Sequence, residues 1–314
     1  MTARNTVVNV SPMTNYTDNF IAAQDGLKLY ARVYGRRTAE GLPVVCLPGL
    51  ARSGRDFDRL ATALTTSDFD MNSKRRRYVI TLDSRGRGRS DFDRDPRNYN
   101  IATELSDVLA MLTALELGPA IFVGTSRGGI LTMLLACMRP SSLAGAVLND
   151  IGPVIEPRGL LRIKSYVGKL PRPRSYEEGA EVLRRLFVTQ FPKLTAEDWI
   201  AFARRTYKEQ NGSLVPDYDV KLSRALDGVG LNRALPSLWK EFDALASVPT
   251  MVVRGANSDV LTADTVAAMR SRRQDLETME IPDQGHAPLL MEDDIIRRIG
   301  SFVGRCDNAR LHQT

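Results

Sequence analysis

The sequence predicts an α/β protein in which a parallel sheet is covered by helices on both faces. Three observations favour this fold class. Short apolar segments alternate with helical segments as far as residue 150, the alternation stops between residues 151 and 246, and it resumes from residue 247. Strands that are apolar throughout are typical of a sheet buried on both faces. The composition, with 43% hydrophobic and 25% charged residues, is that of a globular chain.

The first half of the chain begins with a predicted β-hairpin. Residues 20–23 and 27–34 form its strands, and Asp25-Gly26 supplies the positive φ angles of a tight turn. Strands and helices then alternate, with strands at 43–47, 78–82, 120–123 and 144–148, and helices at 56–64, 101–117 and 130–137. In the helix over 101–117, Asn100 is the expected N-cap and Gly118 the expected end.

The middle of the chain is predicted to be a helical insertion without strands. Its amphipathic segments cover 177–187, 196–207 and 231–242. The alternation returns with strands at 250–254 and 277–281 and helices at 263–269 and 292–303. The predicted organisation is therefore an N-terminal arm (1–18), a core (19–150 and 247–304), an insertion (151–246) and a C-terminal tail (305–314).

The clearest motif is Gly124-Thr125-Ser126-Arg127-Gly128, between an apolar strand and an apolar helix. A sharp strand-to-helix turn folds the backbone onto itself, so the flanking residues must be small. Such a turn exposes the hydroxyl of Ser126 and directs the start of the next helix toward it. This is the G-x-S-x-G nucleophile elbow, and the backbone N–H of Arg127 is a candidate oxyanion donor.

A serine nucleophile needs a base, and the chain has only two histidines. His286 follows the last predicted strand, at the sheet edge where a catalytic base is expected. His312 lies in the polar tail. We therefore expect His286 to be the base, and the alternative is an ordinary surface histidine.

The acid that orients the histidine is expected between Ser126 and His286 in chain order. Asp259 follows the predicted strand at 250–254 and is preferred. Asp150 follows the strand after the elbow and is the rival, with a structural cap as its simpler interpretation. A second oxyanion donor is expected from the loop Leu47-Pro48-Gly49-Leu50, where Gly49 allows close approach and the N–H of Leu50 is the candidate.

Taken together, these residues resemble the α/β-hydrolase fold superfamily over about residues 20–303, apart from the insertion. The resemblance rests on Leu47-Pro48-Gly49, on Asp83-Ser84-Arg85-Gly86-Arg87-Gly88-Arg89-Ser90, on the elbow, on Asp259 and on Gly285-His286. It implies a mostly parallel, eight-stranded sheet and a helical cap over the site. The chain looks most like enol-lactonases, carboxylesterases and carbon–carbon-bond hydrolases. Many relatives have His-Gly in place of Pro48-Gly49, so any help from that histidine side chain is absent.

These observations predict a serine hydrolase that needs no cofactor and no metal. An ester or lactone is the first substrate hypothesis and an amide the second. A carbon–carbon (β-ketolase) reaction with the same triad is an alternative, as is a ligand receptor of this fold with vestigial hydrolysis.

The net charge and the cysteine content limit the classes of partner and compartment that we expect. The net charge of +6 alone could indicate nucleic acid, but no nucleic-acid motif accompanies it, and no apolar run could span a membrane. Three widely spaced cysteines suit a reducing, cytoplasmic compartment. We expect a small-molecule substrate, and either a monomer or a homodimer.

Basic side chains near the site suggest a substrate that bears a carboxylate, because arginine forks match carboxylates. The simpler interpretation is that most of these side chains face water. The residues concerned are Arg52, Arg55, Arg127, Arg158, Arg162, Lys164, Lys169, Arg172 and Arg174.

Overall fold

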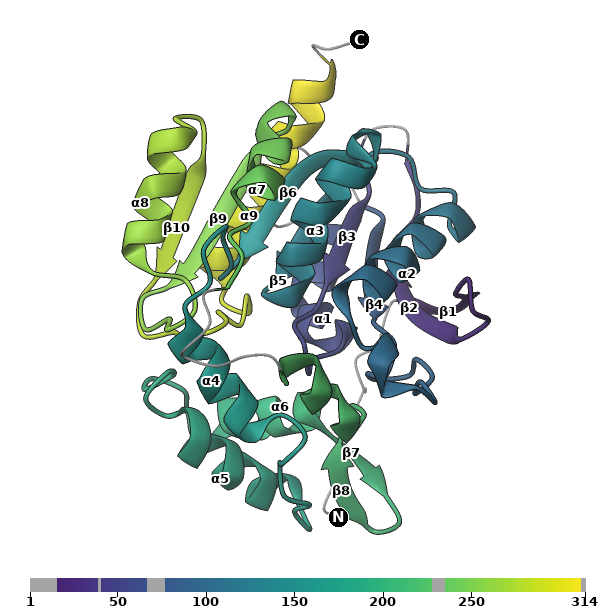
Figure 1. The fold of residues 1–314 in the computed structure, drawn as a ribbon, viewed down its shortest axis with the longest axis vertical. Coiled ribbons are helices and arrows are strands. Elements are labelled where there is room, and N and C mark those ends of the chain that lie inside the picture. The colour runs from purple at the N-terminus through teal and green to yellow at the C-terminus, as the bar shows by residue number, and fades with distance from the viewer. Residues whose placement is uncertain (1–15, 39–40, 67–76, 228–234, 312–314) are drawn as a thin grey trace, which may run out of the picture.

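An eight-stranded, mostly parallel sheet forms the centre of the molecule (Figure 1). The computed structural model describes residues 16–38, 41–66, 77–227 and 235–311. In spatial order the strands are β1 (Tyr16–Ala22), β2 (Lys28–Tyr34), β4 (Val79–Asp83), β3 (Val44–Leu47), β5 (Ala120–Thr125), β6 (Leu143–Asn149), β9 (Thr250–Gly255) and β10 (Glu277–Ile281). Strand β2 pairs antiparallel with β1 and β4, and the other pairs are parallel. The predicted fold class is confirmed.

The hairpin of β1 and β2 lies at one edge of the sheet. Its register pairs Tyr16 with Tyr34, and Gly26 takes the expected positive φ of 82° in the turn. Strand β1 begins at Tyr16, so the last residues of the predicted arm (1–18) are part of the sheet. The rest of that arm lies outside the described residues.

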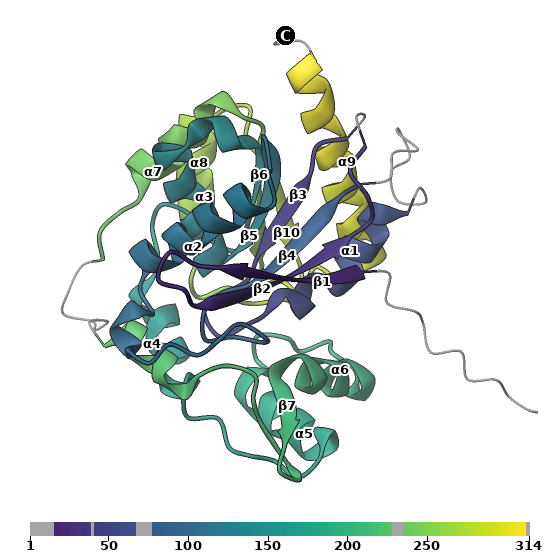
Figure 2. The ribbon, with the colours of Figure 1, turned by 90° about the vertical axis from the view of Figure 1, so that its right-hand side faces the viewer.

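Two helix layers enclose the sheet, which Figure 2 shows between them. Helices α1 (Asp58–Thr65) and α9 (Asp293–Leu311) cover one face. Helices α2 (Ile101–Ala114), α3 (Arg127–Met138), α7 (Trp239–Asp243) and α8 (Ala263–Arg272) cover the other. Within β3, Val44 and Cys46 pack toward the first layer, whereas Val45 and Leu47 pack toward the second. Short 3-10 helices are η1 (Gly54–Phe57), η2 (Pro96–Asn98), η3 (Pro140–Ser142), η4 (Val220–Leu226) and η5 (Ala244–Ser247).

Several predicted helix bounds differ from the structure, since α3 begins at Arg127 rather than residue 130 and α8 ends at Arg272 rather than residue 269. Asn100 caps α2 as expected, its side-chain oxygen accepting from the N–H of Thr103, but the helix ends at Ala114. Glu116, not Gly118, has the positive φ that turns the chain. Helix α9 runs through most of the predicted tail (305–314) because Asp307 is buried in an ion pair with Arg77, at 2.7 Å. His312 lies outside the described residues.

The inserted segment forms a cap of helices α4 (Pro157–Tyr166), α5 (Tyr176–Phe187) and α6 (Ala196–Thr206) with its own apolar core. It also contains a hairpin, β7 (Tyr207–Gln210) and β8 (Ser213–Pro216), so the prediction of an insertion without strands is wrong. The short strand β7 is too polar to show a strand pattern. The sequence pair Asn211-Gly212 could have predicted this hairpin. Both residues have positive φ, as an Asn-Gly hairpin turn requires.

The end of the predicted insertion (151–246) belongs to the core layer. Phe242 and Leu245 pack in the same cluster as the α2 and α3 side chains. The N–H of Leu238 donates to the carbonyl of Pro153, 2.7 Å away, where the chain leaves the core. Residues 231–234 of the predicted helix over 231–242 lie outside the described residues. Residues 235–238 are not helical, so the predicted start is wrong, and the helix begins only at Trp239.

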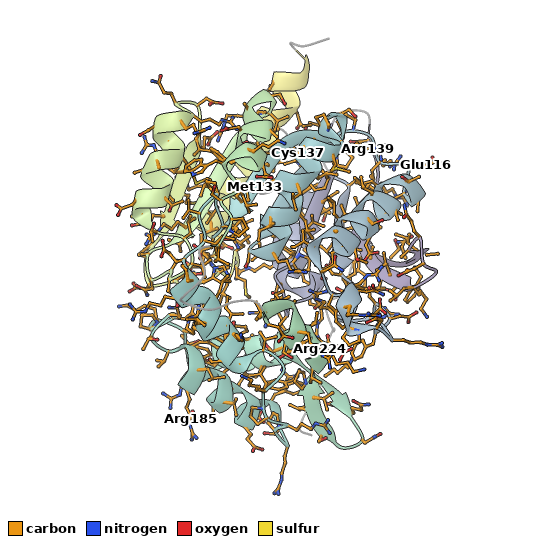
Figure 3. All side chains as sticks on the ribbon, viewed as in Figure 1. Glu116, Met133, Cys137, Arg139, Arg185 and Arg224 are labelled. Carbon is orange, nitrogen blue, oxygen red and sulfur yellow. The ribbon has the colours of Figure 1, made fainter. Side chains whose placement is uncertain are left out.

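The cap sits at one end of the core, as Figure 1 shows. Helix α3 starts beside the cap and ends far from it, where Cys137 and Arg139 are labelled in Figure 3. Within the described ranges, no helix is both long and apolar enough to cross a membrane.

Candidate active site

The turn between β5 and α3 has the strained geometry that the sequence predicts. Ser126 adopts φ 51° and ψ −113°, a conformation that few residues other than glycine adopt. A Cβ on Gly124 would lie 2.5 Å from the carbonyl oxygen of Gly128, and one on Gly128 would lie 2.0 Å from that of Leu47. Only glycine fits at both positions, so these two residues allow the turn to form.

The imidazole of His286 lies against Ser126. Its Nε2 atom is 2.8 Å from the Oγ atom of Ser126, and its side chain is 6% exposed. The loop that carries it is held from two sides. The cap residue Gln190 accepts a hydrogen bond from the N–H of His286 at 2.8 Å, and Asn149 donates to the carbonyl of Pro288 at 2.9 Å.

The carboxylate partner of His286 is Asp150. Its Oδ2 atom is 2.8 Å from the Nδ1 atom of the imidazole, and the residue is fully buried. Its Oδ1 accepts from the N–H of Gly255 at 2.8 Å, and Ser258 donates its hydroxyl to Oδ2 at 2.5 Å. Asp150 has a φ of 57°, which aims the side chain across the end of β9.

The preferred prediction, Asp259, is wrong as the partner of His286, and the rival Asp150 takes that place. The guanidinium of Arg162, on α4 of the cap, forms two hydrogen bonds to Asp259, at 2.6 and 2.8 Å. Burial raises the pKa of Asp259, but the hydrogen bonds and charge of Arg162 outweigh burial and leave this pKa below its usual value. Asp259 thus joins the cap to the core.

The two predicted oxyanion donors belong to segments that both adjoin Ser126. Leu50 borders the cavity that contains Ser126 and His286, and Arg127 is the first residue of α3. Gly49 brings the first loop close, since a Cβ there would lie 3.8 Å from the Cβ of Ser126. Neither N–H donates to another described residue, so both can serve a ligand oxygen.

Glu104 connects the two donor segments and was not among the predicted site residues. One carboxylate oxygen accepts from Arg87 at 2.7 Å, and the other accepts from the Nε of Arg127 at 2.6 Å. Arg87 in turn donates to the carbonyl of Leu50 at 2.7 Å. Its position in the sequence could have revealed it, because Glu104 falls on the buried face of α2, beside Leu105 and Val108. A charged residue there needs paired partners.

The charge of Glu104 is maintained by its partners. Burial acts to raise the pKa of this carboxyl group, but the positive charges and hydrogen bonds of Arg87 and Arg127 outweigh burial, and the pKa is lowered. Glu104 is 1% exposed. The anion is therefore a fixed part of the site.

A cavity of about 120 Å³ opens over Ser126 and His286. Core and cap both line it, and the cap contributes mainly apolar side chains, including Ile163, Leu183, Phe187, Phe191 and Phe202. Its polar lining includes Arg52, Asp56, Arg205 and Thr206.

Most of the predicted basic residues are not in this cavity. Arg158, Lys169, Arg172 and Arg174 are exposed, which agrees with the simpler interpretation of solvated charges. Arg162 pairs with Asp259 and Arg127 with Glu104, while Arg55 lies 3.9 Å from Asp217. Lys164 donates to the carbonyl of Asp227. Of the predicted set, only Arg52 lines the cavity, where it is joined by Arg205.

The chain belongs to the alpha/beta hydrolase family, whose sequence model matches residues 44–298. It is 33% identical to a 3-hydroxybutyrate-oligomer hydrolase of Cupriavidus necator over 257 residues, 79% of this chain and 84% of that protein. It is 24% identical to a 2-(acetamidomethylene)succinate hydrolase of Mesorhizobium japonicum, over 72% of this chain and 78% of that one.

A solved structure gives the same assignment. An alpha/beta hydrolase from Novosphingobium aromaticivorans is 37% identical and superimposes with a TM-score of 0.85, covering 93% of this chain and 99% of that one. Family and relatives together support a hydrolase activity.

Proposed function

We propose that this chain is a serine hydrolase that cleaves short carboxylic esters or lactones through an acyl-enzyme on Ser126. The observation that carries the proposal is the continuous hydrogen-bonded series from the hydroxyl of Ser126 through the imidazole of His286 to the carboxylate of Asp150. In this order the groups can activate a hydroxyl and stabilise the imidazolium that results.

The reaction follows from this geometry. His286 Nε2 accepts the proton of Ser126 as Oγ attacks the ester carbonyl, and the N–H groups of Leu50 and Arg127 donate to the oxyanion. The tetrahedral intermediate collapses, and the leaving alkoxide takes the proton from His286. A water molecule then gives a proton to His286 and attacks the acyl-enzyme, which releases the acid and restores the hydroxyl of Ser126.

Cavity size and composition favour a short substrate. An apolar cavity of about 150 Å³ holds benzene, and the cavity here, at about 120 Å³, is of that order. The name of the 33% identical relative makes oligomers of 3-hydroxybutyrate the first natural substrate class to test. Amides come second because their leaving groups are poorer.

A fluorophosphonate probe tests the nucleophile. We expect wild-type protein to be labelled and to hydrolyse 4-nitrophenyl acetate and butyrate, and Ser126→Ala to lose both properties. A Ser126→Ala variant that is still labelled would overturn the proposal. Labelling without turnover would instead favour a ligand receptor, and faster cleavage of β-diketones than of esters would favour carbon–carbon hydrolysis.

A further inference from the structure

Two arginines from different parts of the fold meet on one wall of the cavity. Arg52 follows the oxyanion loop in the core, and Arg205 lies near the end of α6 in the cap. Their side chains are only 20% and 14% exposed. The same cavity contains Ser126 and His286, so a ligand positioned for attack by Ser126 also lies in the cavity that Arg205 lines.

The negative charge in the cavity is too small to match both arginines. Among the described residues that line it, Asp56 is the one acidic side chain. Its carboxylate accepts two hydrogen bonds from Arg52, at 2.7 and 2.5 Å. Arg205 is 3.7 Å from the same carboxylate, which is beyond hydrogen-bonding distance. Two arginines therefore share one carboxylate, and Arg205 has no hydrogen bond to an anion among the described residues.

The surroundings of Arg205 confirm that imbalance. Arg52 also donates to the hydroxyl of Thr206, so its guanidinium is already engaged on two sides. Burial lowers the pKa of Arg205, and the positive charges of Arg52 and Arg55 lower it further. The negative charges of Asp56 and Asp58 act against this but do not outweigh it. A largely buried guanidinium in this position gains from an anion that approaches it.

We propose that Arg205 binds a free carboxylate on the substrate while the ester carbonyl lies at Ser126. The inference rests on the proposed esterase function and narrows it to short esters or lactones that carry an acid group. Arginine presents parallel N–H donors that match a carboxylate, and the apolar remainder of the cavity strengthens such a contact by excluding water. Arg52, held by Asp56 and Thr206, adds positive charge from the core side.

The test compares two esters that differ only in charge, mono(4-nitrophenyl) glutarate and its terminal amide. We expect wild-type kcat/KM to favour the acid by about 10- to 100-fold, the range of a hydrogen bond to a charged group. In Arg205→Gln this ratio should fall to near 1, mainly through KM, while the rate on the amide changes little.

Arg204→Gln is the matched control. Arg204 is the preceding residue of α6, is exposed and contacts the ring of Tyr176, so its loss removes the same charge outside the cavity. We expect it to leave the ratio unchanged, and Arg205→Lys to retain a part of it. Equal wild-type kcat/KM for the two esters would overturn the inference, even if Arg205→Gln does not fold. So would an equal loss on both esters in Arg205→Gln.

A binding measurement separates this inference from the proposed function. Calorimetric titration of Ser126→Ala with monomethyl glutarate should show binding that is lost in Ser126→Ala/Arg205→Gln. If that dependence is found but the wild type hydrolyses neither ester, the hydrolase proposal fails and the carboxylate site stands. If hydrolysis is normal and binding is independent of Arg205, the carboxylate site fails alone.

Discussion

Asp150 and Ser126 share an unusual backbone feature at the ends of neighbouring strands. Both have positive φ, at 57° and 51°, and both face the same imidazole. Conformations of this kind cost about 1–3 kcal/mol and persist only where the surroundings enforce them. Parallel pairing of β5, β6 and β9 does so, because it fixes the ends of the strands beside one another.

The roles of the two aspartates can be separated by isosteric substitution. We expect Asp150→Asn to lower kcat by about 10⁴-fold, because an amide cannot hold the same tautomer or stabilise the imidazolium. Asp259→Asn should retain kcat within a few-fold, since its carboxylate pairs with Arg162 rather than His286. Steady-state kinetics on 4-nitrophenyl butyrate measure both.

Asp259→Asn is also expected to lower the free energy of unfolding at neutral pH, because it removes the ion pair with Arg162. The pKa of Asp259 is lowered in the folded protein, so its pairing with Arg162 adds stability at neutral pH that is lost as the pH falls below about 4.

The opposite kinetic ranking, with Asp259→Asn inactive and Asp150→Asn active, would contradict the hydrogen bond between Asp150 and His286.

Helix α2 acts as a support for the site although no part of it faces the cavity. Its residue Glu104 joins the loop after β3 to the start of α3 through Arg87 and Arg127. The oxyanion donors belong to these two segments, so the distance between them depends on this buried contact. Glu116, labelled in Figure 3, follows the C-terminal end of α2 and lies away from the cap.

Loss of the Glu104 contact should affect kcat more than KM. In Glu104→Gln the neutral amide loses the charge that holds two arginines, the donors become less well placed, and we expect kcat to fall by about 10- to 100-fold. Asp107→Asn is the matched control, because Asp107 is a second buried acid of α2 and pairs with Arg85 away from the cavity.

Both α2 variants should be less stable, but only Glu104→Gln should lose kcat. Urea unfolding and steady-state kinetics on the same preparations separate the two effects. Equal kcat for the two folded variants would show that Glu104 is purely structural.

Across the whole molecule, the site lies where the carboxyl end of the sheet meets the cap. The carboxyl ends of β5, β6 and β10 supply Ser126, Asp150 and His286, and the cap closes the cavity over them. The contacts that hold the cap to this edge include Arg162 to Asp259 and Gln190 to the loop of His286. The cap therefore contributes to the position of the base as well as to the cavity wall.

The loops after β3 and β4 are joined by a buried carboxyl group, and this affects the stability of the whole fold. Asp83 accepts from the N–H groups of Gly54 and Arg89, at 2.7 and 2.9 Å. Burial raises its pKa to about 6, against an ordinary value of 3.8. The folded state therefore binds the proton more tightly, and the stability due to this group is lost as the pH rises from about 4 through about 6.

We expect Asp83→Asn to remove that dependence. The wild type should lose about 2 kcal/mol relative to the variant between pH 4 and pH 7. Urea unfolding at several pH values measures the difference, which cancels the titration of groups common to both proteins. A constant difference across this range would show that Asp83 titrates normally.

Most core strands and helices, and the catalytic residues at the strand ends apart from the acid, could be predicted from the sequence. Apolar runs and turn residues located the strands, and the glycines around Ser126 predicted an elbow that the structure confirms, because backbone crowding leaves no room for a Cβ. His286 was identifiable because the chain has only one other histidine, at the tail.

The choice between Asp150 and Asp259 required the three-dimensional structure. Both follow strands whose ends adjoin the imidazole, and local pattern cannot distinguish them. The choice depends on contacts between segments far apart in the chain, since Arg162 of the cap binds Asp259 while Gly255 and Ser258 orient Asp150. The roles of Arg205 and Glu104 could not be predicted for the same reason, because their neighbours come from tertiary packing and not from residues nearby in the sequence.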